Sequence, residues 1–240
     1  MSKTVFALLA MALAPFGAYA VDGVVLINQS TLTAAGGTYT ISQPGSYKLS
    51  GNLQAKDTNT TPIVVTADNV TIDLNGFTIS GTNVCAYSFV QNAFACTFTT
   101  AQNGIDGGGS RNLTVSNGTV SGMGQFGINT LGVGSQISSV TVTYNGSDGI
   151  RVGSGLIDRC RVVVNGAHGI HTVGEAGSLQ KSFLDGNNGY GLTGTVWGYS
   201  QNTFSGNNPT VNGGFGAQVN NGLNLGQNQC NQGVCPGAAF

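Results

Sequence analysis

Hydrophobic and polar residues alternate with a period of two in short segments along most of the chain. Examples are residues 140–144 (VTVTY) and residues 160–164 (CRVVV), which are followed at once by Asn-Gly. Alternation over about five residues indicates a strand with one buried face. Because no segment has a helical pattern long enough for a crossover helix, the pattern predicts an all-β protein.

A dipeptide of Gly followed by Ile or Leu recurs at intervals of 20 to 23 residues. It occupies residues 104–105, 127–128, 149–150, 169–170 and 191–192, and Gly216-Ala217 is expected to continue the series. A fixed period in this range indicates one supersecondary unit per repeat, with successive units stacked along one axis.

Asn residues occupy a constant position in these repeats: Asn145, Asn165 and Asn187 each lie four residues before the glycine. Asn tolerates the left-handed backbone region, and stacked amides can hydrogen-bond, so we expect these residues at corners. A sandwich of hairpins is the alternative that Asn-Gly pairs suggest. The constant spacing favours a single-stranded right-handed parallel β-helix, a solenoid in which equivalent strands lie about 4.8 Å apart.

The repeats define the expected domain organisation. Residues 63–81 (IVVTADNVTIDLNGFTISG) are echoed by residues 112–122 (NLTVSNGTVSG), so we expect β-helix coils over residues 63–229, with an insertion at residues 83–103. Residues 21–62 are predicted to form an N-terminal cap and first coil, which would protect an open sheet edge. Residues 230–240 are the expected C-terminal tail.

The first twenty residues predict a signal peptide. Lys3 is followed by an apolar run over residues 5–15 and then by Ala18-Tyr19-Ala20, a cleavage pattern. The run is too short to cross about 30 Å of hydrocarbon, and no later segment is expected to span a membrane. We therefore expect residues 1–20 to be removed and the mature chain to be secreted, periplasmic or on the cell surface.

Composition narrows the possible partners. Only 7% of residues are charged, Lys and Arg total eight, and the formal net charge is -1. Such a chain has no electrostatic excess for phosphates, which argues against nucleic acid as a partner. The oligomeric state is left open.

Five cysteines in an exported chain indicate disulfides, with at least one residue unpaired. The simplest pairings are local, Cys85 with Cys96 and Cys230 with Cys235. Cys160 is then left over, and its alternation with valines predicts a core position. Neither pair has zinc-site spacing and the two histidines are remote from both, so we expect no metal and no cofactor.

Residues 44–53 (PGSYKLSGNL), residues 63–81 and the later Gly-Ile coils resemble secreted bacterial right-handed β-helix proteins of the pectate-lyase-like superfamily. The resemblance covers nearly all of the mature chain and implies the fold. Members of this superfamily include polysaccharide lyases, glycoside hydrolases, epimerases, phage tailspikes and adhesins. Many other members have no assigned reaction, so the resemblance implies the fold and no single activity. The outer face of one parallel sheet forms a long groove, and an extended extracellular polysaccharide is the partner that we expect there.

If the repeated Ile side chains point inward, the residues that follow them point outward. These are Asp106, Asn129, Arg151, His171 and Thr193, with Gln218 expected in register. A positioned Arg and His can bind an acidic sugar and move a proton, so Arg151 and His171 are the predicted catalytic pair. The predicted substrate-binding residues are Asp106 and Asn129 on this column and Asp148, His168 and Tyr190 at its edge. The competing interpretation is that any soluble sheet has polar outward positions.

Motifs of the named activities are missing. The chain has no Asp-Asp pair, only part of a Gly-His-Gly motif in Ala167-His168-Gly169, scattered acids and no Asp-Pro-His-Asp. A metal-independent lyase that uses His171, Arg151 or Lys181 remains open. The leading hypothesis is a protein that binds an extracellular polysaccharide. If the protein is an enzyme, we expect it to cleave this polysaccharide by a lyase-like reaction. The second is a non-catalytic surface or structural protein that mediates adhesion or assembly.

Overall fold

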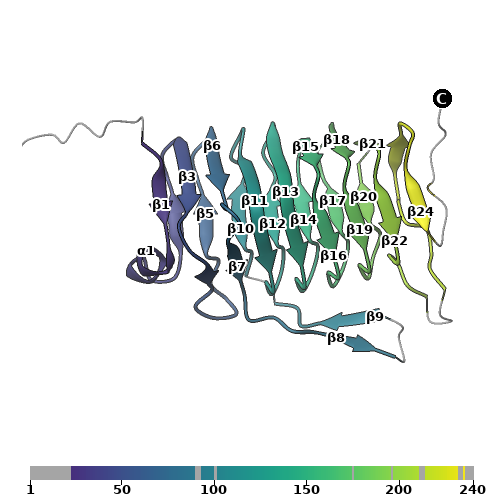
Figure 1. The fold of residues 1–240 in the computed structure, drawn as a ribbon, viewed down its shortest axis with the longest axis horizontal. Helices are drawn as coiled ribbons and strands as arrows, with labels where there is room; N and C mark the ends of the chain where they lie inside the picture. The colour runs from purple at the N-terminus through teal and green to yellow at the C-terminus, as the bar shows by residue number, and fades with distance from the viewer. Residues whose placement is uncertain are drawn as a thin grey trace, which may run out of the picture.

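The computed structural model describes residues 23–89, 93–99, 102–174, 176–195, 197–210, 214–231 and 235. Figure 1 shows these residues as short strands stacked side by side into one elongated solenoid, from which a two-stranded hairpin projects. All strand pairs within the solenoid are parallel, and the hairpin is antiparallel. The predicted all-β, parallel β-helix architecture is therefore confirmed. The predicted signal peptide lies outside the described residues.

Two sheets form the walls of the solenoid. The smaller one has the order β2 (Tyr39–Ile41), β5 (Ile63–Val65), β10 (Ile105–Gly108), β12 (Ile128–Thr130), β14 (Ile150–Val152), β17 (Ile170–Thr172) and β20 (Leu192–Gly194). Each coil contributes one such strand and then turns into the larger sheet.

The larger sheet consists of two columns joined by its two longest strands, β11 (Thr114–Ser121) and β13 (Ser135–Thr143). The other strands of the first column are β1 (Val25–Ile27), β3 (Gly45–Leu49), β6 (Val70–Asp73), β15 (Gly155–Asp158), β18 (Gly177–Gln180), β21 (Trp197–Ser200) and β23 (Gly222–Asn224). Those of the second are β4 (Leu53–Gln54), β7 (Thr78–Ser80), β16 (Arg161–Val163), β19 (Phe183–Asp185), β22 (Thr203–Ser205) and β24 (Gln229–Asn231). Helix α1 (Gln29–Ala34) follows β1 and is capped by the side chain of Asn28.

The repeated Ile side chains form a continuous column inside the solenoid. Ile105, Ile128, Ile150 and Ile170 pair in register and are each 0% exposed. Full burial of one such side chain contributes about 1.5–3 kcal/mol relative to exposure. A shift by one residue would turn this column outward, so the buried face fixes the register and with it the polar positions that alternate with it.

The Asn residues of the repeat form a buried stack of amides, as predicted. Asn145 Nδ2 donates to Asn165 Oδ1 at 2.8 Å, and Asn165 Nδ2 donates to Asn187 Oδ1 at 2.8 Å. The expected left-handed backbone, however, belongs to the preceding residue: Tyr144 has φ 57° and Val164 has φ 54°. The bend lies one residue earlier because the Asn side chain must point inward to reach the next amide.

The insertion predicted within residues 83–103 contains the hairpin of β8 (Cys85–Ser88) and β9 (Ala93–Cys96), here called the arm. Asn83 Nδ2 donates to Tyr144 O at 2.9 Å, and Phe94 N donates to Asn188 Oδ1 at 3.1 Å. Asn188 Nδ2 in turn donates to Phe94 O. The arm therefore lies along the corner that carries Tyr144 and Asn188 (Figure 1).

The predicted disulfides are present, Cys85 with Cys96 and Cys230 with Cys235. Cys160 is the free cysteine and is 3% exposed, as predicted for a core residue. Burial raises the pKa of its thiol to about 11, so the side chain stays protonated at neutral pH. No helix within the described ranges is long and apolar enough to cross a membrane.

Candidate functional site

The predicted polar column on the smaller sheet is present, and we call it the outward ladder. It consists of side chains that follow the buried Ile or Leu of each coil: Asp106, Asn129, Arg151, His171 and Thr193. Each pairs in register with the next, including Arg151 with His171 on β14 and β17. The register is confirmed, whereas the catalytic and binding roles of these residues remain predictions.

The expected sixth member, Gln218, is not on the ladder. Its side chain is 0% exposed and its Oε1 accepts a hydrogen bond from Asn207 Nδ2 at 2.9 Å, which ends the amide stack. Val219 pairs with Leu192 as the inward residue, so the extra residues near 208–217 shift the repeat by two positions from the expected Ala217. Asn220 extends the ladder instead, with Nδ2 3.3 Å from Thr193 Oγ1.

A buried carboxylate orients His171. Asp148 Oδ2 lies 3.0 Å from His171 Nδ1, with the Asp side chain 6% exposed and the His side chain 35% exposed. The other carboxylate oxygen, Oδ1, accepts a hydrogen bond from the His168 backbone N–H at 2.9 Å. An ionised carboxylate can only accept, so the proton of a neutral His171 lies on Nδ1 and Nε2 is the proton acceptor.

His168 has the opposite tautomer. Its Nδ1 accepts a hydrogen bond from the Tyr190 backbone N–H at 3.0 Å, so Nε2 carries the proton in the neutral ring. Burial lowers the pKa of His168 below its ordinary value; the Asp148 charge opposes this and His171 reinforces it. The His168 ring stacks on Tyr190 at 5.6 Å and lies 5.7 Å from the His171 ring. The site thus pairs a proton-accepting imidazole with a hydrogen-bond-donating one.

Arg151 supplies a positive charge beside this pair. Its guanidinium carbon lies 5.3 Å from the centroid of the Phe126 ring, a cation–π arrangement that holds the side chain against the sheet. Arg151 forms no ion pair with any residue that the structure describes. Its charge is therefore available to an acidic ligand, and its planar donors suit a carboxylate.

Asp106 is held by protein donors at the other end of the ladder. Asn129 Nδ2 at 2.9 Å and the Gly108 backbone N–H at 3.0 Å donate to Oδ1, and Asn103 Nδ2 donates to Oδ2 at 3.0 Å. Asp106 also lines a cleft of about 390 Å³ with Val64, Asp68 and residues 107–110. The ladder therefore continues into a hollow that can receive part of an extended ligand.

The structure brings the predicted residues into two groups. Arg151, His171, Asp148, His168 and Tyr190 form one, and Asp106 with Asn129 forms the other. Sequence reasoning missed Asn220, whose position depends on the length of the preceding loop. No group of three or more His, Cys, Asp or Glu side chains in the described part of the chain is placed to hold a metal ion.

The fold and the outward ladder define a parallel β-solenoid with a polar face. The sequence model of the family described as right-handed β-helix region matches residues 56–208, and the chain belongs to this family. The comparison with solved structures matches the full-length tailspike protein 2 of Escherichia coli O157:H7 bacteriophage CAB120, at 13% identity and a TM-score of 0.35. The alignment covers 82% of this chain and 38% of the tailspike. The comparison with curated proteins found no match.

Proposed function

We propose that this protein binds an extracellular polysaccharide along the outward ladder, with an acidic sugar at Arg151 and His171. The observation that carries the proposal is the adjacency, on paired strands, of a carboxylate-oriented imidazole and a guanidinium that forms no ion pair with any described residue. A partly exposed imidazole held by an almost fully buried carboxylate is a costly arrangement for a purely structural surface, because the buried charge must be desolvated.

The same geometry supports a lyase-like reaction on a uronate. Arg151 would bind the sugar carboxylate and so favour loss of the neighbouring C5 proton, which His171 Nε2 would accept. The electrons of the C5–H bond form a C4–C5 double bond, and the C4–O bond to the next sugar breaks. The departing oxygen takes the proton back from His171, whose transient positive charge Asp148 stabilises.

His168 and Tyr190 would support the substrate from the edge of the sheet. The Nε2–H of His168 can donate to a sugar hydroxyl or to the departing oxygen, and the Tyr190 ring can stack on a sugar face. Asp148 then acts as a positioning residue rather than as a direct sugar ligand, because its side chain is 6% exposed.

Incubation with pectins, alginates and other uronates tests both parts of the proposal. Binding is measured by affinity electrophoresis and cleavage by the absorbance of the unsaturated product. We expect Arg151→Gln to weaken binding and Asp148→Asn to reduce cleavage about 10²-fold or more while binding persists, since the amide no longer stabilises the imidazolium.

Arg161→Gln is the matched control, because Arg161 also lies over a ring, Phe183 at 5.9 Å, but on the larger sheet. It should bind and cleave like the unchanged protein. Binding without any cleavage by the unchanged protein would refute the reaction alone. Absence of both would refute the polysaccharide proposal and favour the adhesive or structural alternative.

A further inference from the structure

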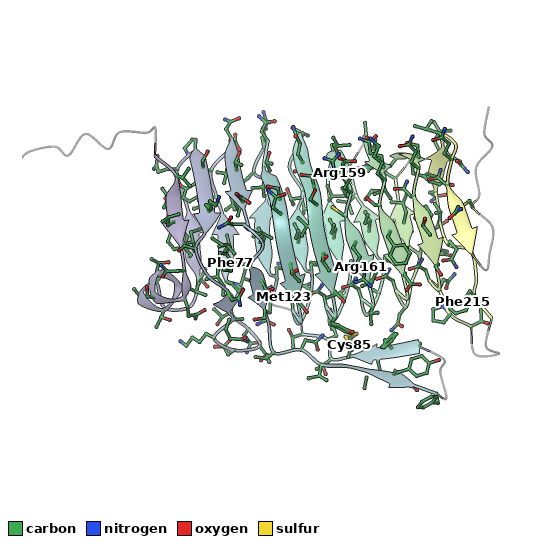
Figure 2. All side chains as sticks on the ribbon, in the orientation of Figure 1. Phe77, Cys85, Met123, Arg159, Arg161 and Phe215 are labelled. Atoms are coloured by element: carbon green, nitrogen blue, oxygen red, sulfur yellow. A yellow bond between two sulfur atoms is a disulfide. The ribbon has the colours of Figure 1, made fainter. Side chains whose placement is uncertain are left out.

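A second, aromatic cleft lies between the arm and the last coils of the solenoid. Its volume is about 220 Å³. Three rings line it, Tyr87 and Phe94 from the arm and Phe215 from the loop before β23, together with the carboxylate of Asp185 on β19. Figure 2 shows Phe215 near the C-terminal end of the solenoid, on the side where Cys85 marks the arm. The cleft is separate from the outward ladder, which belongs to the smaller sheet.

The arm side of this cleft is fixed to the solenoid. The amide of Asn188 brackets the backbone of Phe94 through both its N–H and its carbonyl, as a neighbouring strand would. Tyr87 packs edge-on against Phe94, with ring centroids 5.3 Å apart. An added Cβ at Gly186 would lie 3.9 Å from Phe94 Cε2, an ordinary van der Waals distance, so the Phe94 ring lies close to this part of the solenoid. The two rings of the arm are therefore held in place before a ligand arrives.

Asp185 lines the cleft with a carboxylate that no basic side chain pairs with in the described part of the chain. It points outward from β19 in register with Ser205 of the next coil and Val163 of the preceding coil. Val163 is 3% exposed, whereas Asp185 lines the cleft. Asp185 forms no ion pair with another described residue, and no Lys or Arg lines the cleft.

We propose that this cleft binds an alkylated ammonium group, such as the trimethylammonium head of choline. A cation is attracted by the ring faces and by the carboxylate together, whereas a neutral ligand would desolvate Asp185 without a partner and an anion would be repelled. A primary ammonium carries three N–H donors, which the rings cannot satisfy and for which Asp185 is the one charged acceptor among the described residues that line the cleft. Full alkylation removes those donors and keeps the charge.

Isothermal titration of the purified protein with choline, in an amine-free phosphate buffer, tests this site. The control ligand is 3,3-dimethyl-1-butanol, which has the same shape as choline and no charge. We expect choline to bind at least fivefold more tightly than the alcohol. Phosphocholine is the third probe. Binding of phosphocholine as well as choline would identify the trimethylammonium group as a substituent of a larger molecule. Binding of choline alone would identify the ligand as a free small molecule.

Two substitutions localise the binding. Phe215→Leu keeps an apolar side chain but removes a ring, and should weaken choline about two- to fivefold, the range for one cation–π contact at an exposed site. Asp185→Ser copies Ser205 of the next coil, so it should fold, and should weaken choline at least fivefold. Phe98→Leu, at an exposed aromatic that does not line the cleft, should change nothing.

Equal affinity for choline and the neutral alcohol would overturn the proposal, as would the absence of choline binding. Unchanged binding in both Phe215→Leu and Asp185→Ser would place choline elsewhere and would also overturn it. Because none of these residues belongs to the outward ladder, a failure here leaves the polysaccharide proposal untouched, and loss of polysaccharide binding leaves this one standing.

Discussion

Replacement of Asn165 by Ala should destabilise the solenoid more than any single surface substitution. Its side chain is 0% exposed and lies between Asn145 and Asn187 in the amide stack. Oδ1 accepts from the Asn145 backbone N–H at 3.2 Å and from Asn145 Nδ2 at 2.8 Å, while Nδ2 donates to Asn187 Oδ1 at 2.8 Å. Each Asn thus holds the next coil as well as its own.

The magnitude follows from the groups left without partners. Ala orphans two donors of Asn145, and each buried unsatisfied group costs about 1–3 kcal/mol. Asn187 Oδ1 still accepts a hydrogen bond from the backbone N–H of residue 165 at 3.1 Å, so the lost side-chain donor costs less here than at Asn145. The expected decrease in the free energy of unfolding is therefore about 2–6 kcal/mol before any cavity cost.

Urea denaturation followed by circular dichroism measures this change, with Asn59→Ala as the control. Asn59 is exposed, so its truncation should stay within about 0.5 kcal/mol. A decrease below about 1 kcal/mol for Asn165→Ala would refute the reasoning, since it would mean that water or a backbone shift satisfies the orphaned donors.

Three further predictions concern titration, strain and the arm. The pKa of His168 is lowered in the folded state, so the stability present above about pH 6.5 should fall as the pH drops toward that folded-state pKa. His168→Gln should flatten this part of a stability–pH curve, and an unchanged slope would contradict the prediction. Val164 has a left-handed backbone with φ 54°, so Val164→Asn should raise the free energy of unfolding by about 1 kcal/mol, and a lower thermal midpoint would count against strain there. Removal of the Cys85–Cys96 disulfide by a double Ser substitution should accelerate hydrogen exchange in β8 and β9 and leave exchange in β14 and β17 unchanged, because the arm lies outside the solenoid sheets. Equal acceleration in the arm strands and in the sheet strands would show that the arm supports the coils.

The repeat in the sequence was enough to predict the coil. The inward Ile column, the outward residues from Asp106 to Thr193 and the stacked amides follow from spacing alone, because a β-helix repeats one local geometry at each period. The two disulfides were predicted separately, because the paired cysteines are close in sequence. The same logic failed at Gln218, where extra residues shift the phase, and at the left-handed corner, which lies at Tyr144 and Val164 rather than at the Asn.

Contacts between coils and across the insertion were decided only by the tertiary structure. Asp148 and His171 lie 23 residues apart, and nothing in their spacing specifies that one carboxylate oxygen orients the imidazole while the other binds the His168 backbone. Phe94 and Asn188 are 94 residues apart, and their contact creates the aromatic cleft. A repeat period fixes which side chains share a face, because successive side chains of a strand point to opposite faces. Side-chain rotamers and the path of the non-repeating arm depend on tertiary packing, which the period does not encode.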